Sequence, residues 1–83
     1  MPAWYAYLVR CRDGSLYAGV TTDLERRVAA HNGRAPGGAR YTRTRRPVAL
    51  AWASPPLTKV AAHRLEWRLK RLTPAAKRRL AAG

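Results

Sequence analysis

The chain has 83 residues, 47% of them hydrophobic, which allows one small core and no second one, so we expect a single domain over residues 1–83. Seventeen lysines and arginines oppose four acidic residues, and the resulting net charge of +13 favours a polyanionic partner, most often nucleic acid. The single cysteine, Cys11, excludes an intrachain disulfide, and no apolar run is long enough to span a bilayer, so we expect a cytoplasmic protein with no membrane partner.

The first two expected elements are the strands of a hairpin. Residues 4–11 alternate and are rich in aromatic and aliphatic side chains, and residues 15–20 resume this pattern after the turn signal Asp13-Gly14. A two-residue loop would place Tyr7 and Tyr17 on opposite faces of the hairpin. A three-residue loop, extended by the following serine, would place both tyrosines on one face. The sequence leaves both registers open.

Capping residues and apolar stripes predict the other elements. The capping box of residues 22–25, with Thr22 as the cap, predicts a helix that ends at Gly33. Residues 33–47 hold three glycines, two prolines and five arginines, which is typical of a basic loop. We expect one more strand and two more helices, over residues 48–53, from Thr58 to about Leu72, and from Thr73-Pro74 onward.

This order of elements, ββαβαα, predicts an α+β fold that resembles an α/β sandwich. The hairpin and the strand at residues 48–53 would form a three-stranded sheet, antiparallel or mixed. The helices would flank this sheet.

One of the four acidic residues has no evident local role. Asp13 belongs to the turn, whereas Asp23 and Glu25 lie in the first turn of a helix, where negative charge meets the positive end of the helix dipole. Glu66 lies in the middle of a helix. Either it forms an i,i+4 ion pair with Lys70, or it is available for chemistry.

Two further groups of residues are suited to binding phosphate. Arg27 and His31 are four residues apart and share a helix face, where they either polarise a phosphate or are merely solvated. The basic loop combines guanidinium groups with one aromatic ring, a combination suited to phosphate contacts and base stacking, or it is a solvated loop. The residues concerned are Arg40, Tyr41, Arg43, Arg45 and Arg46.

Taken together, these signals resemble the GIY-YIG nuclease superfamily. The chain carries "YAY" at residues 5–7 and "YAG" at residues 17–19, followed in order by Arg27, His31 and Glu66. More closely, it is similar to the small stand-alone bacterial proteins of this superfamily, which have counterparts of "LYAGVTTDLERRVAAHN" and "RYTRTRRPV". The first motif lacks its glycine and isoleucine, the second has alanine for isoleucine, and no asparagine follows Asn32, although many family nucleases have one after the metal-binding glutamate.

The resemblance implies an endonuclease that hydrolyses DNA phosphodiesters with low sequence specificity, acting on repair intermediates or branched DNA. It implies that Glu66 is the lone protein ligand of one Mg²⁺ or Mn²⁺, a metal that keeps most of its waters. Arg27 would hold the phosphate, Tyr7 would act as the base with Tyr17 as its partner, and His31 would share or relay the proton.

The flanking DNA backbone would contact the basic loop and three cations near the C-terminus, Lys70, Lys77 and Arg78. The main alternative is a catalytically weak nucleic-acid-binding module of the same fold, which the missing asparagine favours. A small RNA-associated structural protein is a third reading of the charge and size, with RNA as the partner.

Overall fold

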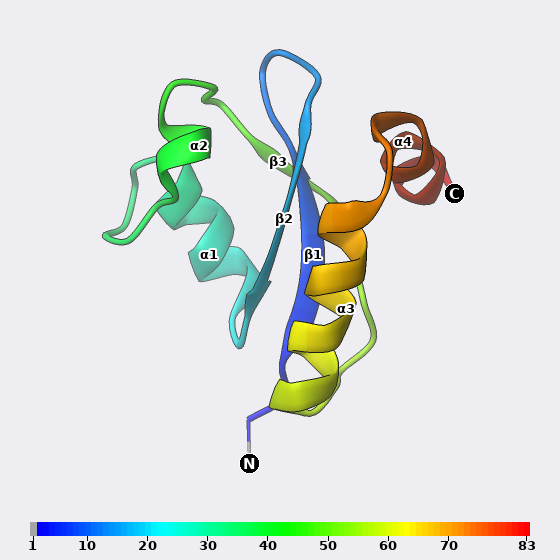
Figure 1. Cartoon of the computed structure of the whole chain (residues 1–83). Coiled ribbons are helices and arrows are strands. Elements are labelled where there is room, and N and C mark those ends of the chain that lie inside the picture. Colours follow the sequence, from blue (N-terminus) through cyan, green and yellow to red (C-terminus); the bar gives the residue numbers. More distant parts are fainter. Residues whose placement is uncertain (1) are drawn as a thin grey trace.

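A three-stranded sheet lies between two groups of helices in the computed structural model, which describes residues 2–83 (Figure 1). The elements are β1 (Tyr5–Arg10), β2 (Leu16–Thr21), α1 (Leu24–His31), α2 (Arg40–Arg43), β3 (Ala49–Ala53), α3 (Lys59–Arg71) and α4 (Pro74–Ala82). Both strand pairs are antiparallel and the strand order is β2-β1-β3, so the α+β prediction is confirmed in its antiparallel form. No helix among the described residues is long and apolar enough to cross a membrane.

The register of the hairpin places both tyrosines on one face of the sheet. Tyr7 lies opposite Gly19, and Val9 lies opposite Tyr17. The amide of Cys11 donates to the carbonyl of Ser15 at 2.8 Å, which leaves a three-residue loop between these two residues. The odd loop length is the alternative that the nuclease interpretation favours, although the loop lies one residue earlier than expected, at residues 12–14.

The two faces of the sheet pack against different helices. On one face, Ala6 and Leu8 of β1 form a core with Ala18 and Leu69, against which α3 and α4 pack. On the other face, Tyr7 and Val9 of β1, and Cys11 directly after this strand, form a second core with Val48, against which α1 packs. Because side chains alternate along a strand, the single buried strand β1 supplies both cores.

The cap of α1 differs from the prediction. Asp23, not Thr22, is the N-cap residue, and its carboxylate accepts a hydrogen bond from the amide of Arg26 at 3.0 Å. β2 extends through Thr21, whose hydroxyl accepts from the amide of Asp23, and this contact shifts the start of the helix by one residue. The predicted end is correct, because Gly33 follows the C-cap with φ +79°, a conformation that glycine adopts without strain.

The segment 33–47, predicted to be a loop, contains the short helix α2. Four residues are too few to show a helical period, and tertiary contacts stabilise this turn instead. The side chain of Thr42 is fully buried and its hydroxyl donates to the carbonyl of Ala39. By contrast, Thr58 and Thr73 cap α3 and α4 as predicted.

Candidate active site

A chain of buried hydrogen bonds links β1, α1 and α2 beneath one face of the sheet. The phenol oxygen of Tyr7 lies 2.8 Å from Nε2 of His31, and Nδ1 of the same ring lies 2.9 Å from Oγ1 of Thr42. The three residues are almost fully buried, with exposed fractions of 1%, 0% and 0%. Such a chain is stable in a protein interior only when every member has a partner.

The partners of Thr42 determine the direction of these hydrogen bonds. Its hydroxyl has one hydrogen, which it donates to the carbonyl of Ala39 at 3.0 Å. Oγ1 therefore accepts the remaining contact, so that Nδ1 of His31 carries the proton. The Nε2 atom is then the acceptor, and the hydroxyl of Tyr7 donates to it.

Burial keeps both ends of the Tyr7–His31 pair neutral at physiological pH. The pKa of His31 is lowered to about 4, first by burial and then by the positive charges of Arg27 and Arg46. The pKa of Tyr7 is raised, mainly by burial, although the hydrogen bond from Arg27 opposes this effect. The pair is thus an uncharged phenol that donates to the acceptor nitrogen of an uncharged imidazole.

Arg27 connects this pair to the glycine-rich segment that follows α1. Its Nε donates to the phenol oxygen of Tyr7 at 3.1 Å, and its Nη1 donates to the carbonyl of Gly37. Arg27 lies one turn before His31 in α1, so the predicted same-face arrangement of these two side chains is observed. The half-buried guanidinium brings a fixed positive charge to the phenol.

Gly19 explains why β2 needs a glycine at this position. The ring of Tyr7 lies across Gly19, and a Cβ there would overlap the phenol oxygen and the adjacent ring carbon. Tyr7 is hydrogen-bonded on both sides, so it has little room to move away. The glycine of the "YAG" motif therefore admits the tyrosine of the "YAY" motif.

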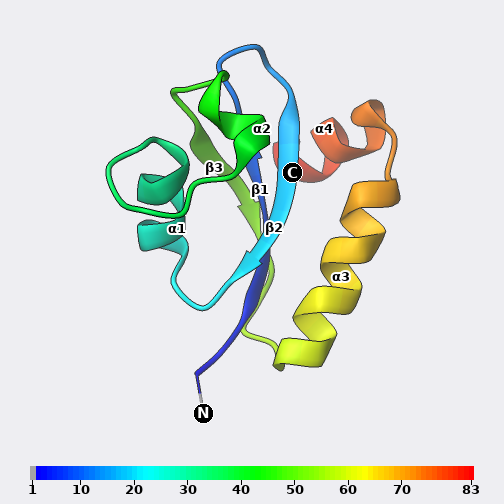
Figure 2. The same cartoon turned by 60° about the vertical axis from the view of Figure 1, so that its left-hand side comes forward.

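Glu66 approaches the site from the other side of β2. This edge strand lies between α1 and α3 in Figure 2, and α3 carries Glu66. Its side chain is 20% exposed and forms an i,i+4 ion pair with Lys70 at 3.4 Å, which is the structural alternative considered for this residue. The negative charge of Glu66 also contributes to the raised pKa of Tyr7.

Tyr17 is joined to the basic segment by stacked rings. Its ring lies edge-on to His31 with centroids 5.6 Å apart, and it stacks on Tyr41 at 5.4 Å with a 17° interplanar angle. The guanidinium of Arg45 lies 3.9 Å from the centre of the Tyr41 ring. The stack extends from the surface to the buried imidazole.

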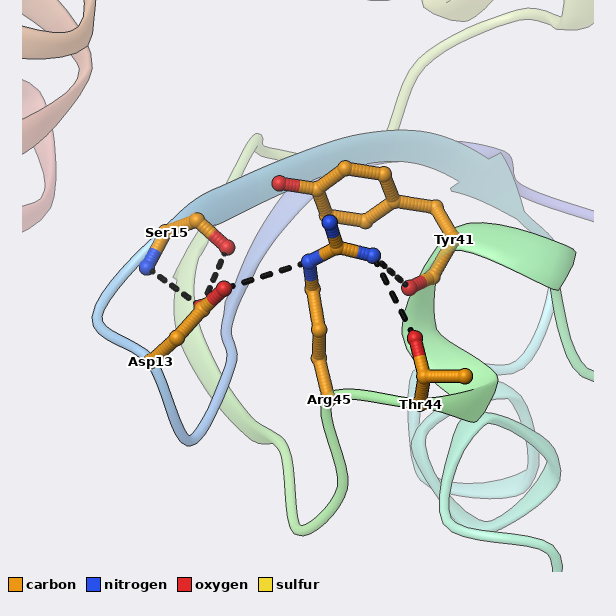
Figure 3. A network of polar contacts seen from close by, with 5 residues as sticks. All are labelled: Asp13, Ser15, Tyr41, Thr44 and Arg45. Atoms are coloured by element: carbon orange, nitrogen blue, oxygen red, sulfur yellow. Dashed lines mark hydrogen bonds and ion pairs between the residues drawn. The ribbon is translucent and has the colours of Figure 1, made fainter.

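Arg45 fastens this stack to the hairpin loop, as Figure 3 shows. Its Nε pairs with Asp13 at 3.1 Å, and its Nη1 donates to the carbonyl of Tyr41 at 2.9 Å. Asp13 in turn accepts from the amide and the hydroxyl of Ser15, and these contacts lower the pKa of its carboxyl. Two residues predicted to contact nucleic acid, Arg45 and Tyr41, thus also hold the hairpin against α2.

The other predicted nucleic-acid contacts divide into inward and outward side chains. Arg46 is half-buried, and its Nε donates to the carbonyl of His31 at 2.7 Å. A small cavity of about 180 Å³ lies between the hairpin loop, Tyr41 and the start of α4, where Lys77 and Arg78 line it. The remaining cations are exposed: Arg40, Arg43 and Lys70.

Comparison with known proteins assigns this chain to a family. A profile described as the GIY-YIG catalytic domain matches residues 3–79. The chain belongs to the GIY-YIG family. It is 47% identical over 79 residues to a UPF0213 protein of Desulfotalea psychrophila, covering 95% of this chain and 71% of the relative. It is 46% identical over 76 residues to one of Halobacterium salinarum, covering 92% and 96% of the two chains.

A solved relative has the same fold. The solution NMR structure of a UPF0213 protein from Bacillus halodurans is 41% identical and superimposes with a TM-score of 0.54, covering 95% of this chain and 82% of that one. The predicted resemblance to small GIY-YIG proteins is thereby confirmed. Membership places the chain in a superfamily of nucleases, which generally act on nucleic acid with divalent metal ions.

The acidic residues of this GIY-YIG chain suit a metal that keeps its own waters. No group of three or more His, Cys, Asp or Glu side chains within residues 2–83 could enclose a metal ion. Glu66 offers one partly exposed carboxylate, and a single hard oxygen ligand fits Mg²⁺ or Mn²⁺ better than it fits zinc. The donor set is therefore compatible with the metals that the resemblance implied.

Sequence reasoning missed two residues that organise the site of this GIY-YIG chain. Thr42 fixes the orientation of His31, and Asn32 ties the end of α1 to β3, since its side-chain amide both donates to and accepts from the backbone of Val48. A threonine in a basic segment carries no chemical signal of its own. Its place inside the "RYTRTRRPV" segment that resembles the family was the only available sign.

Proposed function

We propose that this protein is a metal-dependent endonuclease that hydrolyses DNA phosphodiesters with low sequence specificity, on repair intermediates or branched DNA. The observation that supports this most strongly is the buried arrangement in which Arg27 donates to Tyr7, Tyr7 donates to His31, and Thr42 fixes the acceptor nitrogen. A neutral phenol that donates to a neutral imidazole nitrogen, next to a fixed guanidinium, is suited to activating water next to a phosphate.

In this proposal Tyr7 is the base and passes its proton onward. As water attacks phosphorus, its proton moves to the phenol oxygen while the phenol proton moves to Nε2 of His31, so no free tyrosinate forms. The P–O bond to the leaving strand breaks, and the departing oxygen takes a proton from solvent water. This relay matters because the raised pKa of Tyr7 disfavours the tyrosinate. The pKa of His31 is lowered first by burial and then by Arg27 and Arg46. The negative charge of a bound phosphate would offset the effect of the two arginines and would favour protonation of the imidazole.

Arg27 would stabilise the charge that develops on the phosphate. Its Nε and Nη1 are held by Tyr7 and the carbonyl of Gly37, which fixes the guanidinium before substrate arrives. Removing a preorganised donor of this kind typically lowers the rate by about 10²–10³. Tyr17, packed against His31, would position the water or the phosphate.

Glu66 would hold one Mg²⁺ or Mn²⁺, giving up its ion pair with Lys70. A bound ion of this kind supplies a Lewis acid that polarises a phosphate oxygen. Arg40, Arg43, Lys70, Lys77 and Arg78 would contact the flanking backbone. Such contacts carry no base specificity and make binding strongly salt-dependent.

A nicking assay on supercoiled plasmid and on junction DNA, with Mg²⁺ or Mn²⁺, tests the proposal with matched controls. Glu66→Gln and Arg27→Ala are expected to reduce cleavage at least 100-fold. Glu25→Gln and Arg26→Ala change the same residue types on the exposed surface of α1 and should cleave like wild type. Cleavage that survives both site substitutions would show that the assigned site is wrong.

The alternative function is a catalytically weak module of the same fold that binds DNA or RNA. The ion pair between Glu66 and Lys70 favours it, because this pair gives Glu66 a structural role. The same assay separates the two functions. If the wild-type protein never cleaves and yet binds nucleic acid with a steep dependence on salt, its function is that of a binding module.

A further inference from the structure

The outer face of α3 carries a stripe of side chains that neither core uses. Val60, Arg64, Trp67 and Arg71 follow one another at spacings of four, three and four residues, which places them on one side of the helix. Val60 and Trp67 are 59% and 61% exposed. In Figures 1 and 2, α3 lies at the outside of the molecule, so this face looks away from the sheet.

A broad surface groove of about 780 Å³ follows this stripe. Its lining residues are Lys59, Val60, His63, Arg64, Trp67 and Arg68. Three of them are cations and none is acidic. The single acidic residue of α3, Glu66, lies on its half-buried side and is paired with Lys70.

Trp67 is the exposed aromatic ring of this groove, and cations surround it. The guanidinium of Arg71 lies 4.6 Å from the ring centre, while Arg64 and Arg68 line the groove beside the ring. A partner that covers this ring would remove apolar surface from water, which is favourable. An indole ring among guanidinium groups is the combination that binds unpaired bases by stacking and their phosphates by charge.

We infer that the outer face of α3 binds single-stranded nucleic acid, with one base stacked on Trp67 and phosphates on Arg64, Arg68 and Arg71. Charge complementarity selects this partner. Two exposed apolar side chains, Val60 and Trp67, are too few for the apolar centre of a protein interface or for insertion into a membrane. In a duplex the bases are stacked on one another, so their faces are not available to the indole.

This surface would extend the contacts of the proposed nuclease without depending on cleavage. Trp67 directly follows Glu66 in α3, so the predicted metal ligand and the stacking ring emerge from one turn of one helix. The stripe from Val60 to Arg71 spans about 16 Å along the helix, which is room for a few unpaired nucleotides. An unpaired flap or gap next to a cleavage point would supply them.

Binding of a dye-labelled oligothymidylate, followed by fluorescence anisotropy on the full chain, tests the inference. Trp67→Leu is expected to weaken binding about tenfold, whereas Trp67→Phe, which keeps an aromatic face, should retain most of the affinity. Arg64→Ala combined with Arg68→Ala should reduce the slope of log K against log salt by about 1.4, the value for two lost phosphate contacts.

Control variants separate this surface from general charge and from catalysis. Arg26→Ala and Leu50→Ala, on α1 and β3, should leave the affinity for oligothymidylate unchanged. Glu25→Gln, on the exposed surface of α1, should also bind the oligothymidylate normally. The anisotropy assay is run without divalent metal and measures binding alone, so a failure of cleavage and a failure of this surface are distinguishable. Wild-type affinity in Trp67→Leu would overturn the inference. So would self-association of the wild-type protein in sedimentation velocity that Trp67→Leu abolishes, because the face would then be a protein interface.

Discussion

The central strand β1 builds two interiors that differ in kind. Toward α3 it presents Ala6 and Leu8, whose side chains belong to a cluster of apolar residues. Toward α1 it presents Tyr7, whose phenol is committed to His31 and Arg27 through hydrogen bonds. One strand therefore contributes a purely apolar core on one face and, on the other, a core that includes a chain of hydrogen bonds.

The difference between these two interiors concerns how each tolerates change. An apolar core loses stability in proportion to the volume removed, whereas a buried polar chain fails when one member loses its partner. Within residues 2–83, no buried side-chain nitrogen or oxygen lacks a hydrogen-bond partner. The face toward α1, the polar face, thus holds one arrangement of donors and acceptors within its core, and the face toward α3, the apolar face, has no such arrangement in its core cluster.

Leu8→Ala attacks the apolar face and is expected to have the largest effect. The side chain of Leu8 is fully buried between the sheet and α3, so truncating it should lower the free energy of unfolding by about 4 kcal/mol. Urea denaturation monitored by circular dichroism measures this change. Leu50→Ala, at an exposed position of β3, is the control and should cost less than about 1 kcal/mol. Equal losses in the two variants would contradict the assignment of the core.

Acid should act on the polar face through His31. The folded protein keeps this imidazole neutral down to its pKa of about 4, whereas the unfolded chain takes up a proton below about pH 6.5. Protonation therefore favours the unfolded state, and the free energy of unfolding should fall by about 3 kcal/mol between pH 6.5 and pH 4. Urea titrations across this range, compared with His31→Gln, isolate the effect. Identical pH slopes in the two proteins would show that His31 does not cause it.

Much of the fold follows from local signals, and the exceptions have physical causes. The caps Thr58 and Thr73 were predicted because a hydroxyl before an apolar stripe is a local signal. Thr22 and Asp23 are both good caps, and the choice between them depends on where β2 ends, which is a tertiary property. The helix α2 exists because Thr42 is buried against His31, a contact between residues eleven positions apart.

The residues of the candidate site could be predicted from the sequence, but the hydrogen bonds between them could not. Tyr7, Arg27 and His31 follow from the family resemblance, and the structure brings them into contact. Their role in cleavage stays a prediction. The hydrogen bond from Arg46 to the carbonyl of His31 links residues fifteen positions apart and could not be read from a run of arginines, all of which look equally suited to phosphate.

Gly19→Ala is expected to have the next smaller effect. It adds a methyl group on β2, next to the polar face of β1. The added methyl group would overlap the phenol of Tyr7 and force the ring away from His31. We expect a loss of about 2 kcal/mol in the free energy of unfolding, measured by urea denaturation. In a Tyr7→Leu background the same substitution should cost almost nothing, because the overlapping atoms are gone. A cost that is the same in both backgrounds would place its origin in the backbone of β2 instead.

Thr42→Val is the smallest and sharpest change, because it keeps the shape of the side chain and removes the acceptor for Nδ1 of His31. Leaving that buried N–H without a partner should lower the free energy of unfolding by about 1.5 kcal/mol. It should also shift the imidazole toward the other tautomer, which ¹⁵N chemical shifts of His31 report directly. Thr42→Ser should keep the wild-type tautomer, and Thr44→Val, at an exposed position of the same segment, should leave it unchanged.

If the tautomer is unchanged in Thr42→Val, some other group fixes the imidazole, and the polar face does not depend on this hydroxyl. If it changes while stability barely moves, Thr42 acts on the orientation of His31 more than on the fold, and the separation between the two faces of β1 becomes sharper still.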